Sequence, residues 1–152
     1  RQMCIRDRGL DAIILARAGL ERLGLASRIT EILDPSWMLP AVSQGALGLE
    51  CRADDREALS ALRPLNDSPT RQAVLAERAL LRGLGGGCLV PIGAAAEVTR
   101  DRLTLRAAVL APDGSRRVAD NMDGPAEDAE NVGRRLAERM LAAGAREVLA
   151  MR

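Results

Sequence analysis

Three consecutive glycines, Gly85 to Gly87, impose the strongest constraint on how this 152-residue chain can fold. They stand between a helix-forming stretch and the short apolar sequence Cys-Leu-Val, and Cys88 follows them directly. Glycine has no Cβ and tolerates positive φ, so the backbone can turn sharply here and approach a large flat ligand closely. The sequence therefore predicts a thiol on a loop with open space beside it.

Several common uses of a glycine-rich loop or a cysteine do not fit these residues. A phosphate-binding loop needs Gly-Lys-Ser/Thr at the start of a helix, whereas these glycines lead into a β-like segment. A protease-type cysteine needs a histidine base, and the sequence contains no histidine. Cys4, Cys51 and Cys88 lack the close spacing of metal ligands, so we expect no metal site. Cys88 is then either a thiol that bonds covalently to a reactive electrophile or a buried cysteine without a role.

The composition is that of an ordinary globular protein, with 47% hydrophobic and 28% charged residues. With one Trp and no Phe or Tyr, the chain has no aromatic platform on which nucleic-acid bases could stack. The basic residues are all arginine and are spread along the chain, and the net charge is +1, so we expect no binding to nucleic acid or to an acidic membrane. The three cysteines are scattered and no apolar run is long enough to span a bilayer, which favours a cytoplasmic protein.

The first part of the chain has the pattern of an α/β structure. The apolar run 11–15 is typical of a buried parallel strand, and residues 16–23 continue it as a helix that a glycine ends. Residues 27–33 predict one or two helical turns. Residues 45–52 alternate small and apolar side chains like a strand, which would place Cys51 in a core.

Two helices are expected before the glycines. The first covers residues 54–62, and the second runs from Ser68 to about residue 82, with Ser68 as its N-cap and a proline at its first position. The charged pair Glu77 and Arg78 falls outside the apolar stripe of this second helix, or else forms an interior ion pair.

After the glycines, the pattern predicts three antiparallel strands followed by helix. The strands are expected at 89–98, 102–110 and 115–121, with a hairpin turn at Pro112-Asp113-Gly114. An amphipathic helix is expected over 125–143, ended by Gly144, with a last helical turn or two over 145–151. The sequence thus predicts a compact α+β domain with a three-stranded antiparallel sheet from about residue 68 onward.

Four separated stretches of the chain occur in the order and approximate spacing of one known family. They are DAIILARAGLERLGL (11–25), LPAVSQGALGLECR (39–52), AERALLRGLGGGCLVPIGAAAE (76–97) and APDGS (111–115). By these stretches the chain resembles the porphobilinogen deaminase, or hydroxymethylbilane synthase, family. The resemblance runs from about Gly9 to the C-terminus.

The resemblance implies a transferase of tetrapyrrole (porphyrin and haem) biosynthesis. Members of this family condense four porphobilinogens stepwise, with loss of ammonia, into hydroxymethylbilane on a dipyrromethane cofactor that a thioether joins to a cysteine, matched here by Cys88. The other positions that match cofactor-binding residues are Arg22, Gln44, Gly45, Gly86 and Gly87. The chemistry agrees with a plain thiol: loss of ammonia from porphobilinogen gives an electron-poor azafulvene, and about 3% of an ordinary thiol is thiolate at pH 7.

The resemblance also implies three domains, of which this chain supplies only the last one whole. Residues 9–40 match the end of the second periplasmic-binding-protein-like α/β domain, 41–65 match a return segment of the first, and 66–152 match the cofactor-carrying α+β domain. Residues 1–8 carry no motif that resembles the family, and we expect them to be a non-native leader. The family's catalytic aspartate lies upstream of Gly9, so no catalytic residue is assigned, and we expect the chain alone to be inactive. Family members bind porphobilinogen and its oligomers as monomers.

The residues allow a second interpretation of the role of Arg22, of the loop at Ser43 and of the function. Arg22 lies near a helix C-terminus, where the macrodipole favours an exposed arginine without any ligand. The family's usual glycine before Gln44 is Ser43 here, and because serine tolerates positive φ poorly, the loop conformation is in question at this position. The alternative function is a non-catalytic ligand-binding module in which the glycine loop is merely a hinge.

Overall fold

The computed structural model describes residues 11–87 and 90–151, and the chain divides into two compact units between Leu33 and Asp34. In the first unit, helix α1 (Arg17–Arg22) ends where predicted, because Gly24 adopts a φ of +70°. The predicted strand at 11–15 is wrong for this structure: the segment is irregular and Ile14 is 67% exposed. The helical turns expected over 27–33 shrink to a single 3-10 turn at Ala26–Arg28.

The second predicted strand, at residues 45–52, is also absent, since this segment has no regular structure. Leu47 is 80% exposed and Leu49 is 62% exposed, while Cys51 is half-buried rather than a core residue. A strand needs neighbours to accept and donate its backbone hydrogen bonds, and no strand among the described residues pairs with this one.

Both helices expected before the glycines form, and aspartates cap them. Helix α2 (Arg56–Leu62) begins at Asp55, whose Oδ1 accepts the N–H of Ala58 at 3.0 Å. A 3-10 turn follows at Arg63–Leu65. Helix α3 spans Ser68–Gly83, and its N-cap is Asp67, whose Oδ1 accepts the N–H of Thr70 at 2.9 Å. The prediction of Ser68 as N-cap is therefore wrong by one residue.

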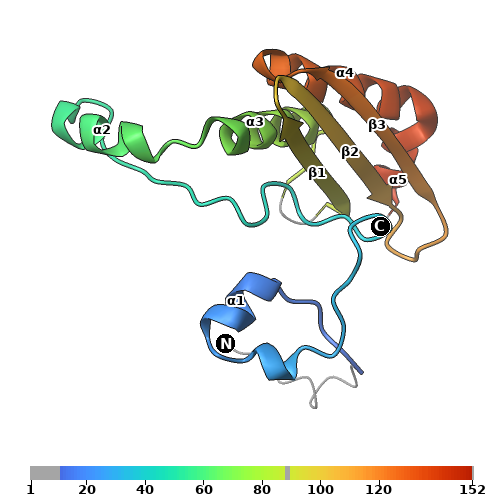
Figure 1. Cartoon of the computed structure of the whole chain (residues 1–152). Coiled ribbons are helices and arrows are strands. Elements are labelled where there is room, and N and C mark those ends of the chain that lie inside the picture. The colour runs from blue at the N-terminus through green and yellow to red at the C-terminus, as the bar shows by residue number, and fades with distance from the viewer. Residues whose placement is uncertain (1–10, 88–89, 152) are drawn as a thin grey trace. The chain divides into compact units, whose positions relative to one another are not determined.

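A three-stranded antiparallel sheet in the order β1-β2-β3 confirms the predicted C-terminal architecture (Figure 1). The strands are β1 (Ile92–Thr99), β2 (Arg102–Leu110) and β3 (Arg117–Pro125). The hairpin between β2 and β3 turns at Gly114, which has a φ of +74° as its position in the turn requires. Strand β3 runs four residues past its predicted end because each of these residues still pairs with β2.

Helices α3 and α4 (Ala129–Met140) cover one face of this sheet and enclose the hydrophobic core (Figure 1). Burial alternates along β2, so that Leu103, Leu105 and Val109 point into the core while their neighbours on the other face are exposed, Ala108 excepted. The two helices approach closely at Gly133, where a Cβ atom would collide with the backbone of α3. A 3-10 turn (Ala126–Asp128) precedes α4, a π turn (Leu141–Ala145) follows it with Gly144 at a φ of +96°, and α5 (Arg146–Ala150) comes last.

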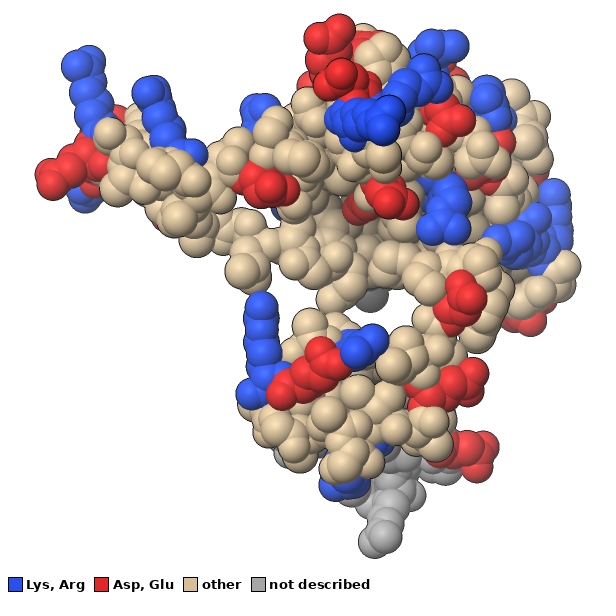
Figure 2. Space-filling view, in the orientation of Figure 1, with Lys and Arg blue, Asp and Glu red and all other residues tan. Residues whose placement is uncertain are grey.

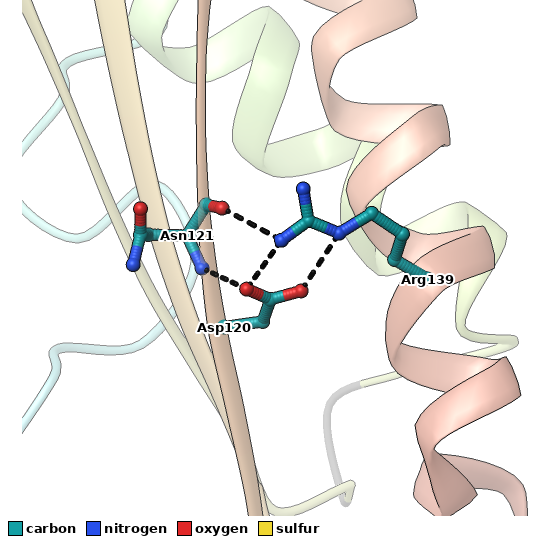
Figure 3. A network of polar contacts seen from close by, with 3 residues as sticks. All are labelled: Asp120, Asn121 and Arg139. Atoms are coloured by element: carbon teal, nitrogen blue, oxygen red, sulfur yellow. Dashed lines mark hydrogen bonds and ion pairs between the residues drawn. The ribbon is translucent and has the colours of Figure 1, made fainter.

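A polar network ties β3 to α4 at the edge of the core (Figure 3). Arg139 donates from Nε to Asp120 Oδ2 at 3.0 Å and from Nη2 to the carbonyl oxygen of Asn121 at 3.1 Å. The hydrogen bond from Arg139 lowers the pKa of Asp120 below its ordinary value. The network therefore fixes the edge strand by an ion pair in addition to its backbone pairing.

Acidic and arginine side chains are interspersed over the face of the second unit seen in Figure 2. Within the two described stretches of chain, no helix is long and apolar enough to cross a membrane.

Candidate functional site

The glycine loop begins with a tight stop at the end of α3. The N–H of Gly85 bonds to the carbonyl oxygen of Arg82, and that of Gly86 to the carbonyl oxygen of Leu81, both at 3.0 Å. With Gly85 at a φ of +70°, this is a Schellman motif, the arrangement in which glycine most often ends a helix. The predicted sharp turn at the glycines is confirmed, and Cys88, the residue of greatest interest, lies outside the described residues.

Gly86 and Gly87 have different surroundings. A Cβ on Gly86 would lie 2.6 Å from Leu81 Cδ1 and 2.7 Å from Ile92 Cδ1, so this residue is packed between α3 and the start of β1. A Cβ on Gly87 would meet nothing within 4 Å, and the residue is exposed. Among the described residues, the loop is therefore packed at Gly86 and open at Gly87. These residues fit a covalently tethered flat ligand.

Gln44 and Gly45 lie in a pair of overlapping turns. The N–H of Gln44 bonds to the carbonyl oxygen of Ala41 at 3.0 Å, and that of Ala46 to the carbonyl oxygen of Ser43 at 3.2 Å. Gly45 has a φ of +89°, and Ser43 has a φ of +62°, so the serine takes the left-handed conformation that suits a glycine. Both Gln44 and Gly45 are exposed to solvent.

The segment before these turns docks on the free edge of β1. The carbonyl oxygen of Pro40 accepts the N–H of Ala94 at 3.0 Å, and Ala41 forms an antiparallel bridge with Gly93. Since Ile92, one residue earlier in β1, contacts Gly86, the start of β1 lies between the glycine loop and the segment that leads to Gln44. The structure thus places Gly86 and the segment that leads to Gln44 against neighbouring residues at the start of β1, Ile92 to Ala94.

Glu77 is a buried carboxylate that joins these parts, and the sequence analysis missed it. It is 8% exposed and lies on α3; its Oε2 accepts the N–H of Ser43 at 2.6 Å and its Oε1 accepts the N–H of Ala96 at 2.7 Å. Burial raises the pKa of Glu77, and the bonds from Ser43 and Ala96 oppose that rise. The placement outside the apolar stripe is wrong, and so is the interior ion pair, because the described partners of Glu77 are backbone N–H groups and Arg78 is exposed.

A signal for this burial was present in the helix periodicity. Glu77 stands four residues after Ala73 and three before Leu80, which are the spacings of one helix face. A single carboxylate inside such a face predicts a buried acceptor rather than a solvent-exposed charge.

Arg22 is the last residue of α1 and is exposed in the first unit. Among the described residues, no side-chain hydrogen bond or ion pair of Arg22 is seen. Its position at the exposed C-terminal end of a helix is one at which the macrodipole alone favours an arginine.

Comparisons with known proteins agree along most of the chain. Residues 1–60 match the family model described as porphobilinogen deaminase, dipyrromethane cofactor binding domain, and residues 71–142 match the model described as porphobilinogen deaminase, C-terminal domain. Cys88 lies inside the second match. Porphobilinogen deaminase of Nitrosomonas europaea is 52% identical over 139 residues, which is 91% of this chain and 45% of that protein. The Trichlorobacter lovleyi enzyme of the same name is 48% identical over 145 residues, or 95% of this chain and 46% of that protein.

The chain spans about half the length of the curated relatives it matches. The two family models occur in it one after the other, and the C-terminal one covers the α3, sheet and α4 assembly that the structure shows. The chain therefore belongs to the porphobilinogen deaminase family.

Proposed function

We propose that the complete protein to which this chain belongs performs the porphobilinogen deaminase reaction of tetrapyrrole biosynthesis. Four molecules of porphobilinogen and one of water become hydroxymethylbilane and four of ammonia. The observation that carries the proposal is the pair of family matches, one of them to the dipyrromethane cofactor binding domain, together with about 50% identity to proteins of that name.

Cys88 is the residue we assign to cofactor attachment. It directly follows Gly87, whose surroundings are open, and it sits on a loop that the Schellman motif anchors to α3. When bound through a thioether, dipyrromethane supplies the primer on which the pyrrole chain grows. The chain's own contribution is the anchored end of α3, whose Schellman motif at Gly85 and Gly86 leads toward Cys88.

Gln44 and Gly45 are assigned to the wall of the cofactor site. The docking of Pro40 and Ala41 on β1 supports this role, because it places the segment that leads to the exposed Gln44 turn beside Gly93 and Ala94, which directly follow Ile92, the residue packed near Gly86. The amide of Gln44 can donate to or accept from a polar group of the ligand.

Arg22 is assigned to a carboxylate of the cofactor or of the growing chain. Each pyrrole ring of these compounds carries an acetate and a propionate, and a guanidinium fork recognises such groups by charge-assisted hydrogen bonds worth about 1.5 to 3 kcal/mol each. In the complete protein we expect residues 9–40 and 41–65 to belong to two periplasmic-binding-protein-like α/β domains and residues 66–152 to form the cofactor-carrying domain. We further expect a cytoplasmic monomer whose partners are porphobilinogen and its oligomers.

Intact mass spectrometry of the full-length protein tests this function. We expect a covalent two-pyrrole adduct on the wild-type protein, its loss in Cys88→Ser, and its retention in the matched control Cys51→Ser, which changes a half-buried cysteine in the irregular segment. A wild-type mass without any adduct, in a protein that forms no hydroxymethylbilane, would instead favour a non-catalytic ligand-binding module. The 152-residue chain alone is expected to yield no hydroxymethylbilane, because it spans about half of its relatives.

A further inference from the structure

Glu77 holds two backbone segments that are far apart in the sequence. Its two carboxylate oxygens accept one N–H each, from Ser43 in the turn before Gln44 and from Ala96 in β1. Among the described residues, Glu77 is the only charged residue that is buried. A buried carboxylate is costly unless hydrogen bonds satisfy it, so this position is specified by its two donors.

Glu77 is the acceptor for the backbone N–H groups of Ser43 and Ala96. Strand β1 pairs with β2 on one side, and on its other edge Ala94 donates to Pro40, whereas Ala96, two residues further, donates to Glu77. Glu77 therefore continues the cover of this edge beyond the point at which the 40–41 segment supplies a backbone acceptor.

The hold on Ser43 is of particular consequence because its backbone is strained. A serine at a φ of +62° is in a region that L-residues occupy at a cost, and it persists only where surrounding contacts impose it. The bond to Glu77 Oε2 is one such contact, and the packing of Val42 against the core is another. The Ser43 hydroxyl is buried without a partner among the described residues, so it is the backbone N–H of Ser43, not the side chain, that makes the connection.

We propose that Glu77 is a positioning residue that fixes the Ser43–Gly45 turn against the helix leading to the Cys88 loop. Helix α3 carries Glu77 and, six residues later, ends at Gly83 just before the glycine loop. A single side chain thus links the turn that contains Gln44 and Gly45 to the helix that leads into the glycine loop. This inference rests on the proposed function for its kinetic consequence, while its structural part stands on the two hydrogen bonds.

The test uses Glu77→Gln in the full-length protein. Glutamine has the same shape but only one acceptor oxygen, so one of the two N–H groups faces an NH2 group and the turn loosens. We expect hydrogen exchange at the Ser43 or Ala96 amide to accelerate by at least about tenfold, and kcat/KM for porphobilinogen to fall by at least about tenfold. The two-pyrrole adduct on Cys88 is expected to remain, since the thiol is untouched.

Two variants serve as matched controls. Glu130→Gln makes the same change at an exposed glutamate of α4 that pairs with Arg82, and we expect kcat/KM within about twofold of wild type. Ser43→Gly keeps the N–H that Glu77 accepts and relieves the strained φ, so we expect the Ala96 amide to exchange as in wild type.

If Glu77→Gln does not fold, Val42→Ala is a second variant that tests the same role. It removes two methyl groups from the side of the turn that packs on the core, without touching Glu77, and should lower kcat/KM in the same way but by less. A folded Glu77→Gln or Val42→Ala protein with faster exchange in the turn but wild-type kcat/KM would refute the positioning role, and so would unchanged exchange at both amides in Glu77→Gln. A wild-type protein with neither adduct nor product would refute the proposed function instead, and the exchange measurements would still decide whether Glu77 holds the turn.

Discussion

Strand β2 and residues 45–51 have similar alternating patterns but opposite environments. In β2, Leu103 and Leu105 are fully buried, whereas Leu47 is 80% exposed and Leu49 is 62% exposed. β2 has a hydrogen-bonded strand on each side and a layer of helices on one face, and residues 45–51 pair with no strand among the described residues. The difference teaches that an alternating pattern specifies which face can be buried, while the presence of neighbours decides whether a strand forms at all.

Hydrogen exchange on the 152-residue chain should show this contrast most strongly. We expect the amides of Leu103 and Leu105 to exchange at least about a thousandfold more slowly than those of Leu47 and Leu49, because the former open only with the whole domain. Two-dimensional NMR or mass spectrometry after proteolysis measures both regions in one sample. Comparable protection in the two regions would mean that residues 45–51 do have a partner in this chain.

Local features of this fold were predictable from the sequence because they depend on residues close together in the chain. Gly24 after α1, Gly144 in the turn between α4 and α5 and Gly114 in the hairpin all have the positive φ that the glycine suggested, although α4 itself is shorter than the expected 125–143. The choice of Asp67 over Ser68 as N-cap was not predicted, since both residues are good caps and only the geometry of the first turn separates them.

Features that depend on distant residues were less predictable. The site residues Gly86 and Gln44 were singled out by resemblance, but the docking of the segment before Gln44 on β1 depends on the pairing of Ala41 with Gly93, which no local pattern indicates. The burial of Glu77 had a local signal in the periodicity of α3, but its two donors did not, because they are 34 and 19 residues away in the sequence.

A substitution at Gly133 would disturb the packing of α4 on α3, the helix layer that covers β2 and that residues 45–51 lack. A Cβ at this position would lie 2.8 Å from Ala79 Cβ and 3.0 Å from the backbone nitrogen of Leu80, and it would also strike the carbonyl oxygen of Ala76. Because backbone atoms cannot swing aside, we expect Gly133→Ala to lower the free energy of unfolding by about 2 kcal/mol, despite the better helix propensity of alanine. Urea unfolding followed by circular dichroism measures this change.

The matched control is Gly19→Ala in α1, where a Cβ would meet nothing within 4 Å. We expect no loss of stability in the second unit from this variant. Equal stability of the Gly133→Ala and wild-type proteins would show that α3 and α4 can separate without cost, and that the burial of β2 does not depend on their close approach.

Residues 40–43 are intermediate between β2 and residues 45–51, because they dock on β1 at one bridge and through Glu77. The pH dependence of the free energy of unfolding should test how Glu77 contributes to stability. Burial raises the pKa of Glu77, so the folded chain holds this proton more tightly than the unfolded chain does. The resulting stability is fully present below the ordinary pKa of glutamate and is lost as the pH rises through the raised value. We therefore expect the free energy of unfolding of wild type, relative to Glu77→Gln, to fall from acid to neutral pH, whereas a rise would mean that the two N–H donors outweigh burial.

The smallest effect is expected at Asp120, where an ion pair supports the edge strand β3. Arg139 lowers the pKa of Asp120, so this contribution is present above the ordinary pKa of aspartate and is lost as the pH falls through the lowered value, opposite in sign to that of Glu77. Both side chains are partly exposed to solvent, which screens the pair, and we expect Asp120→Asn to cost only about 0.5 kcal/mol at neutral pH.

Asp123→Asn is the matched control on the same strand, because Asp123 accepts a hydrogen bond from the Thr104 hydroxyl rather than from an arginine, and asparagine can still accept it. If Asp120→Asn destabilised the protein no more than Asp123→Asn at neutral pH, the ion pair would contribute nothing measurable. The ordered state of β3 would then rest on its backbone pairing with β2 and on the packing of Met122 and Val118 against the core, and residues 45–51 pair with no strand among the described residues.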